Sequence, residues 1–311
     1  MINTLTLNPA VDKILYVDKF EKNITTRIKR VLYTIGGKGT HVSINLSIMG
    51  EKNNAFGWAH GAVGKQVMEM LGEYEGVNVC FNYKDEQNTR TNYLLNEKNG
   101  DSTLITEKGA QLSKEDLDAT IAKLRENMHK GDFLALSGDA SNYADPYVYN
   151  YILEALSDME LKVFLDSSGA SLKKCLDKKP FLIKPNADEL SMICDRHVEE
   201  ETNDVVDAIK SLDKYDINVI AVSLGGKGSV VKYYDRYFEV KPPKINVRNT
   251  VGCGDCYLSG LLYGFSKGME IEDILSYATA VSAATAESEL SVGFDMKRAQ
   301  ELIGKAQIKE L

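Results

Sequence analysis

The chain has 311 residues, of which 43% are hydrophobic, and a formal net charge of −8. This size and composition are typical of one large α/β domain or two smaller ones. The acidic balance, without a cluster of lysine and arginine, argues against nucleic acid as the main partner. No apolar run reaches the roughly 18 residues of a membrane span, and the first residues lack the basic segment of a signal peptide.

Five cysteines lie at scattered positions, and an odd number does not suit a disulfide framework. We therefore expect a reducing, cytoplasmic environment and no membrane partner. Cys253 and Cys256 form a C-x-x-C pattern, but no further residues are spaced to complete a zinc site. A redox pair, or a thiol whose pKa is lowered at the start of a helix, stays open as an interpretation.

Short strand-like runs alternate with helical runs over most of the chain. This alternation predicts a mostly parallel sheet with helices on both faces. Residues 113–128 form the clearest expected helix, which Ser113 and Asp116 open with a capping-box pattern. The other expected elements include strands at 2–7, 55–58, 77–81, 133–136, 162–165, 181–184, 219–222, 230–234 and 237–240, and helices at 146–159, 204–212, 256–267, 270–289 and 295–306.

Two separate segments predict a second, smaller sheet. Residues 14–17 and 27–34 alternate between polar and apolar side chains, as strands with one wet face do. Residues 93–95 and 103–106 flank Asn99-Gly100, a strong hairpin signal. We expect these four strands to form a small sheet from inserts at about 11–35 and 88–108.

The glycine-rich stretch Gly252-Cys253-Gly254-Asp255 precedes a helical run. Such a turn can aim backbone N–H groups and the positive end of a helix at an anion, most commonly a phosphate. A carboxylate beside a phosphate site has a use if it accepts a proton from an attacking hydroxyl. Asp255 could equally cap the helix, and this stretch alone does not separate the two readings.

Gly36-Gly37-Lys38-Gly39 is a second glycine-rich turn at the start of a helix. Lys38 could hold a substrate phosphate there as a point charge, or the turn could be a flexible surface feature. The pattern is not a Walker A motif, because Gly39 stands where that motif needs Ser or Thr.

Asn186 and Glu189 lie three residues apart at an expected helix start, so they share one face. An amide oxygen and a carboxylate suit Mg²⁺, although an ordinary helix cap explains the same pair.

The turn from Ser223 to Gly228 allows close approach of backbone to a ligand. It is not a dinucleotide-binding fingerprint, because a strand and not a helix follows it.

Several of these motifs together resemble one family. The stretch Asn249–Asp255 resembles the C-terminal signature of the ribokinase-like sugar kinases, the phosphofructokinase B group, and Gly36–Gly39 matches their N-terminal signature. The segment from Leu7 to Asp12 and the pair Thr89-Arg90 are similar to the branch that acts on phosphorylated ketohexoses. The resemblance covers almost the whole chain and implies a single three-layer domain over residues 1–311 with a β-sheet lid.

The resemblance implies ATP-dependent phosphorylation of a sugar phosphate, with fructose 1-phosphate first and tagatose 6-phosphate as the alternative. Cys253 replaces the usual Ala or Ser, His41 the usual Asn, and Ser137-Gly138-Asp139 departs from a Ser-Gly-Ser pattern. The implied roles are catalysis for Gly252, Cys253, Gly254 and Asp255; substrate binding for Asp12, Gly37, Lys38, His41, Arg90 and Ser137; nucleotide binding for Lys184, Ser223, Gly225 and Gly228; and Mg²⁺ binding through water for Asn186 and Glu189.

Other functions stay open at this stage. A homodimer through the lid is expected by resemblance. A catalytically silent sugar-phosphate sensor would bind without producing ADP, although Asp255 and the Asn186/Glu189 pair argue against it. A dinucleotide-binding dehydrogenase would need a glycine fingerprint earlier in the chain.

Overall fold

The computed structural model describes residues 1–138, 140–167 and 169–311. Asp139, which is part of the departure expected near the sugar pocket, lies outside the described residues. Where the chain is described, no helix is both long enough and apolar enough to cross a membrane.

The described residues form a larger sheet of ten strands. Its first seven strands are parallel, and the last three continue it in antiparallel order. The strand order is β5 (Val77–Lys84), β4 (Asn53–His60), β1 (Ile2–Thr6), β8 (Phe133–Ser137), β9 (Lys162–Asp166), β10 (Leu182–Ile183), β11 (Val219–Ser223), β12 (Ser229–Tyr233), β13 (Arg236–Lys241) and β14 (Gln307–Glu310).

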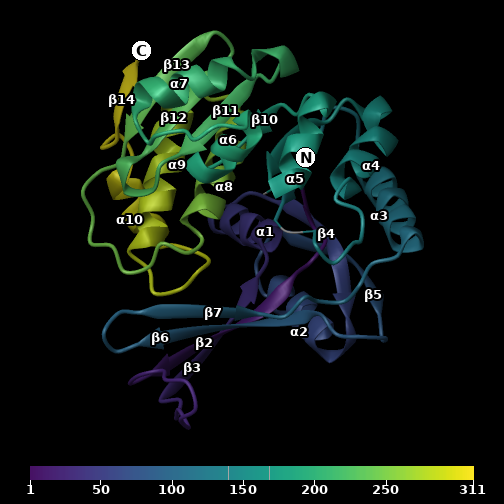
Figure 1. The fold of residues 1–311 in the computed structure, drawn as a ribbon. Coiled ribbons are helices and arrows are strands. Elements are labelled where there is room, and N and C mark those ends of the chain that lie inside the picture. The colour runs from purple at the N-terminus through teal and green to yellow at the C-terminus, as the bar shows by residue number, and fades with distance from the viewer. Residues whose placement is uncertain (139, 168) are drawn as a thin grey trace.

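Helices cover both faces of this sheet, as the alternation in the sequence predicts (Figure 1). One face carries α3 (Lys114–Asn127), α4 (Val148–Ala155), α5 (Gly169–Cys175), α6 (Ala187–Cys194) and α7 (Thr202–Lys210). The other carries α1 (Lys38–Ile48), α2 (Gly61–Gly72), α8 (Cys253–Ser266) and α9 (Ile271–Ala286), with α10 (Met296–Leu302) packed on α9.

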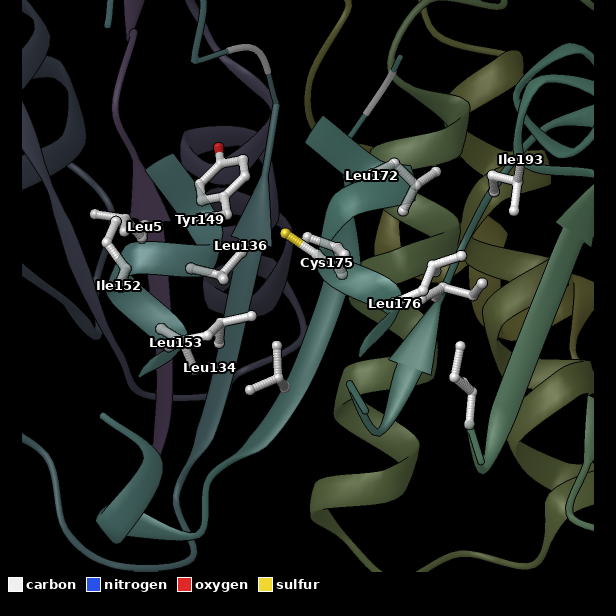
Figure 2. Packing of buried hydrophobic residues seen from close by; sticks show 14 of the residues in the cluster. Leu5, Leu134, Leu136, Tyr149, Ile152, Leu153, Leu172, Cys175, Leu176 and Ile193 are labelled. Carbon is white, nitrogen blue, oxygen red and sulfur yellow. The ribbon is translucent and has the colours of Figure 1, made fainter. Parts of the chain in front are cut away.

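The strand residues divide between the two faces because successive side chains of a strand point in opposite directions. In β8, Leu134 and Leu136 join the core under α4 and α5, whereas Ala135 joins the core on the other face, which α1 and α8 cover. Figure 2 shows Tyr149 and Leu172 in the first of these cores. Burial on both faces explains why the central strands β8, β9, β10 and β11 are mostly apolar.

A separate four-stranded sheet extends away from the body of the molecule (Figure 1). Its order is β3 (Arg30–Gly36), β2 (Ala10–Val17), β6 (Arg90–Glu97) and β7 (Ser102–Thr106). These are the strands that the early alternating runs and the Asn99-Gly100 hairpin predict. We call this sheet the lid.

Local signals predict some boundaries well and one poorly. The capping box of α3 is confirmed, with reciprocal contacts between Ser113 and Asp116. The expectation of a helix over 295–306 is wrong at its end, because α10 stops at Leu302 and the chain then turns at Gly304 into β14. The backbone of this last strand pairs with β13, and that pairing is invisible in a local pattern.

The carboxyl ends of the parallel strands meet along one edge of the larger sheet. Ser137, Asp166, Lys184 and Ser223 end or directly follow neighbouring strands there. Open α/β sheets bind ligands at this edge, so the fold brings residues distant in sequence to one place.

The packing of α8 on α9 requires a residue without a side chain at Gly260. A Cβ added there would lie 2.5 Å from the Cα of Ala278. We expect Gly260→Ala to lower the free energy of unfolding by about 1–3 kcal/mol, because an overpacked site forces backbone shifts. Urea unfolding measures this. Gly72→Ala is the matched control, since Gly72 ends α2 with open space around it; equal losses at both positions would contradict the account.

Candidate functional site

The glycine-rich turn at 252–254 begins α8 as expected. Gly252 caps the helix with a φ of 83°, and a Cβ there would lie only 1.7 Å from the carbonyl oxygen of Ser291. Only glycine fits this backbone and this space. Asp255 lies in the first turn of α8 and is buried, although its side chain makes no capping contact. The cap interpretation of Asp255 is therefore wrong.

His41, on α1, contacts Asp255 directly. Its Nδ1 lies 2.7 Å from Asp255 Oδ2, and its Nε2 lies 2.8 Å from the carbonyl oxygen of Ile35. Burial alone would lower the pKa of His41, but the hydrogen bond and charge of Asp255, together with the charge of Asp12, raise it above its ordinary value. The site thus joins α1, α8 and the lid strand β3.

Asp12 brings the lid strand β2 to the same place. It accepts a hydrogen bond of 2.7 Å from Asn92 on β6. Burial raises the pKa of Asp12, although the charge of His41, the Asn92 hydrogen bond and the charge of Arg90 act in the opposite direction. Asp12, Arg90 and His41 therefore influence one another electrostatically, as substrate-binding residues of one pocket would.

A second charged cluster centres on Asp166, at the end of β9. Its carboxylate is buried between Lys38, at 3.1 Å, and Lys184, at 3.3 Å. Burial opposes the charged form of Asp166, but the two lysines outweigh it and hold the pKa of that carboxyl below its usual value. The same partnership, against the opposing effect of burial, raises the pKa of Lys38 above its usual value.

The glycine turn of α8 connects these two clusters. A Cβ on Gly254 would lie 3.5 Å from the Nζ of Lys184. Lys38 also experiences the charge of Asp255. Backbone N–H groups at the start of α8 and the ammonium groups of Lys38 and Lys184 thus lie near the Asp255 carboxylate. The N–H and ammonium groups suit a bound anion, and the carboxylate suits a neighbouring group that must lose a proton.

A cavity of about 450 Å³ opens on the other side of Gly254. Ser223, Gly225 and Gly228 line it, as expected, with Cys253 and Gly254. The strand β13 leaves no room for a side chain at Gly228, where a Cβ would lie 1.9 Å from the carbonyl oxygen of Val240. The remaining lining residues are Gly226, Ser229, Pro242, Pro243, Lys244, Ile245, Val247, Thr250, Tyr257, Thr279, Ser282, Ala283 and Ala286.

The remaining predicted residues lie along the same edge. Gly37 caps α1 with a φ of 107°, and Ser137, at the end of β8, is fully buried. The Ser137 hydroxyl has no hydrogen-bond partner within the described residues. A buried hydroxyl without a partner is costly, so Ser137 suits a polar ligand that supplies the missing bond.

Asn186 and Glu189 form a reciprocal capping box at the start of α6, with hydrogen bonds of 2.8 and 2.9 Å. The ordinary cap that their spacing predicts is therefore present. Among the described residues, no three His, Cys, Asp or Glu side chains form a metal-binding group. A carboxylate has two oxygens, so the cap uses Oε2 of Glu189 and is compatible with a metal bound through water at the other.

The two cysteines of the C-x-x-C pattern are not low-pKa thiols. Burial raises the pKa of Cys253 to about 11, and it raises the pKa of the fully buried Cys256 further. The expectation of an activated thiol at this helix start is wrong, because desolvation of the thiolate exceeds the effect of the helix terminus.

Sequence reasoning missed three groups. Asp166 ends the mostly apolar strand β9, and this position is the one feature of the sequence that could have indicated an acidic residue in the site. Asn92, which holds Asp12, follows Arg90 on the same strand. Thr279 gave no signal; its hydroxyl lines the cavity, is buried and has no hydrogen-bond partner in the described part of the chain.

The Asp166 cluster yields a stability prediction. Asp166→Asn leaves two lysines without their shared counter-charge, and removing one partner of a buried pair typically costs about 3–5 kcal/mol. We expect a loss of this size in urea unfolding. Asp158→Asn is the matched control, because Asp158 pairs with Arg125 at the surface and exposed pairs contribute about 0–1 kcal/mol. A comparable loss from both variants would contradict the account.

Comparison with known proteins agrees with this geometry. The profile of the pfkB family carbohydrate kinases matches residues 6–294. A tagatose-6-phosphate kinase of Staphylococcus epidermidis is 30% identical over the full length of both chains. A 1-phosphofructokinase of Vibrio cholerae is 32% identical over 99% of this chain and 96% of its own.

The fold has a close counterpart among solved structures. Phosphofructokinase-2 of Escherichia coli, solved in complex with potassium, superposes with a TM-score of 0.91 and covers 98% of both chains at 22% identity. The ribokinase-like α/β fold with a small separate sheet is therefore confirmed. The chain belongs to the pfkB family of carbohydrate kinases and is an ATP-dependent sugar kinase.

Proposed function

We propose that the chain transfers a phosphoryl group from ATP to a phosphorylated ketohexose, with fructose 1-phosphate as the preferred acceptor at its 6-hydroxyl. The product is fructose 1,6-bisphosphate. The observation that carries this proposal is the meeting of one buried carboxylate, Asp255, with the lysine cluster around Asp166 at the start of α8. The names of the relatives support a phosphosugar acceptor.

Asp255 accepts the proton of the attacking hydroxyl in this proposal. The N–H groups of Gly252, Cys253 and Gly254 stabilise charge on the transferring phosphoryl group, helped by the positive end of α8. Lys184, next to Gly254, adds a fixed positive charge beside the nucleotide phosphates.

Lys38 and Arg90 hold the phosphate that the acceptor already carries. Lys38 contributes a point charge and Arg90 a planar fork suited to bidentate contact. Asp12, Gly37 and Ser137 contact the sugar. The buried hydroxyl of Ser137, which has no hydrogen-bond partner among the described residues, supports this arrangement. His41, the other predicted substrate-binding residue, has both ring nitrogens engaged by Asp255 and Ile35, so it acts through Asp255 and not on the sugar.

The cavity beside Gly254 suits a nucleotide. Its size is within the range of small-molecule sites, and the buried hydroxyl of Thr279 offers a hydrogen bond that the described protein leaves unused. Ser223, Gly225 and Gly228 let backbone approach the ligand. Mg²⁺, held through water by Asn186 and Glu189, would neutralise charge on the nucleotide phosphates.

Tagatose 6-phosphate is the second candidate acceptor, favoured by the relative that matches over the full length of both chains. His41 stands where the family has an Asn, so this position of the pocket differs from the family pattern. A silent sensor is the least favoured reading, because Asp255 is intact.

Substrate preference tests the proposal directly. We expect ADP release with Mg-ATP to give the highest kcat/KM for fructose 1-phosphate among fructose 1-phosphate, tagatose 6-phosphate, fructose 6-phosphate and the unphosphorylated sugars.

Asp255→Asn should lower kcat by about 10²–10⁴, the usual contribution of a general base. Asp273→Asn, an exposed acid in the first turn of α9, should leave kcat unchanged.

Three outcomes would contradict parts of this proposal. Preference for an unphosphorylated sugar would overturn the assignment of Lys38 and Arg90 to a substrate phosphate. Near-normal kcat in Asp255→Asn would remove Asp255 from its role. Binding of sugar phosphate without any ADP release would favour the sensor.

The lid is proposed to pair two copies of the chain. Apolar side chains are exposed on its edge strands β3 and β7 and on the connection between β2 and β3, and exposed apolar residues favour association. They are Ile24, Ile28, Val31, Tyr33, Leu104 and Ile105, with exposures between 37% and 63%.

A single charge in the lid tests this dimer. We expect a dimer for the unmodified chain in analytical ultracentrifugation and a monomer for Leu104→Asp, because a buried carboxylate at an interface lacks a partner. Met192→Asp is the matched control, since Met192 is similarly exposed on α6, away from the lid. A monomeric unmodified chain, or dissociation by both variants, would defeat the proposal.

A further inference from the structure

The contact between His41 and Asp255 constrains the number of protons in the site. Both imidazole nitrogens of His41 face acceptors, Asp255 Oδ2 at 2.7 Å and the Ile35 carbonyl oxygen at 2.8 Å. The side chains of both residues are at most 10% exposed. Water therefore has little access to relieve a mismatch between them.

A carbonyl oxygen can only accept, so Nε2 of His41 must carry a hydrogen to contact Ile35. The contact at Nδ1 then needs a second hydrogen, either on Nδ1 itself or on Asp255 Oδ2. If neither carried it, a nitrogen lone pair would face a carboxylate at 2.7 Å. The observed geometry is therefore that of a pair holding two protons.

The charges around the pair fit this count. Asp12 on β2 faces His41 and favours the imidazolium, while Asn92 and Arg90 from β6 face Asp12. Lys38 on α1 is the cation that acts on Asp255 from the other side, and the thiols of Cys253 and Cys256 are the neighbours on its own helix. The raised pKa of His41 has the same direction as the geometric argument.

We propose that His41 and Asp255 act as one proton-accepting unit, which takes the proton of the acceptor hydroxyl after it has released one of its two protons, because a positive imidazolium opposes protonation of the neighbouring carboxylate. This inference rests on the proposed phosphoryl transfer. His41 is a positioning residue, since it acts through Asp255 and holds the proton that sets the charge of the base.

The unit with one proton, on Nε2, receives the hydroxyl proton at Asp255. The hydroxyl oxygen forms a bond to the γ-phosphorus, and the bond from that phosphorus to the bridging oxygen breaks, leaving its electron pair on ADP. The unit then holds two protons again and returns one to solvent before the next turnover.

The consequence is that the turnover rate falls at low pH, and that the pair containing His41 sets the pH at which it falls. An isolated aspartate would lose its proton near pH 4, so its activity would be constant across the neutral range. The pair instead gains activity as the pH rises through a value above about 6.5, the ordinary pKa of histidine. An asparagine at position 41 could contact sugar hydroxyls but could not titrate.

Stability should change in the opposite sense. A group whose pKa is raised by folding stabilises the folded state fully below its unfolded pKa, here about 6.5. This contribution is lost as the pH rises through the folded value. The unit therefore stabilises the chain most at pH values where it cannot yet accept a proton.

The test is the pH dependence of single-turnover phosphoryl transfer, with Mg-ATP and the best acceptor, between about pH 5 and pH 9. Below the apparent pKa of the unit, we expect the unmodified rate to fall about tenfold per pH unit. His41→Asn should move this limit to lower pH by more than one unit, and His41→Gln should do the same if Asn does not fold. His129→Asn, at an exposed histidine, should leave the profile unchanged.

An unshifted acid limit in a folded His41 variant would overturn the inference, as would an effect confined to KM, which indicates sugar contact alone. Imidazole ¹⁵N NMR gives a readout without activity: His41 should carry hydrogens on both nitrogens at neutral pH and lose one in Asp255→Asn. A neutral His41 signal together with an ionised Asp255 in the carboxyl ¹³C spectrum would also overturn it. No transfer by the unmodified chain to any sugar at any pH would instead reject the proposed function.

Discussion

The contact between His41 and Asp255 ties together parts of the chain that lie 214 residues apart. His41 belongs to α1, Asp255 to α8, and the second partner of the imidazole, Ile35, to the lid strand β3. One buried side chain therefore connects the glycine turn of each helix to the lid. Because a buried charge needs a partner, movement of any one of these elements would expose an unpaired group.

Charge is arranged in two linked clusters around that contact. Asp12, His41 and Asp255 form one, and Lys38, Asp166 and Lys184 form the other, with Lys38 acting on both. A phosphoryl group placed between them would meet positive charge and backbone N–H groups, while the attacking hydroxyl would meet a carboxylate. This separation of roles is what transfer of a phosphoryl group to an alcohol requires.

Much of this arrangement could be predicted from the sequence because its signals are local. The turns at Gly37 and Gly252 need glycine for backbone reasons, and the Asn99-Gly100 hairpin defines two lid strands. Asp255 follows such a turn directly. The central parallel strands, which helices cover on both faces, are mostly apolar, so the larger sheet also shows a clear pattern in the sequence.

What could not be predicted depends on contacts between distant segments. Nothing local to His41 indicates that both its nitrogens would meet acceptors, and nothing local to Asp166 indicates two lysine partners. The strand β14 exists through pairing with β13. The sequence predicts a lowered pKa for the Cys253 thiol because the helix terminus is visible in it. The burial of the thiol, which raises the pKa, is not visible in the sequence.

The central claim is that a phosphorylated ketohexose gains a second phosphate from ATP. Phosphorus NMR of the completed reaction with fructose 1-phosphate tests it most directly, since each phosphate ester gives its own signal. The account predicts loss of the γ-phosphate signal of ATP and the appearance of a sugar carrying two ester phosphates in equal amounts. Conversion of ATP to ADP and free inorganic phosphate, with fructose 1-phosphate unchanged, would contradict it.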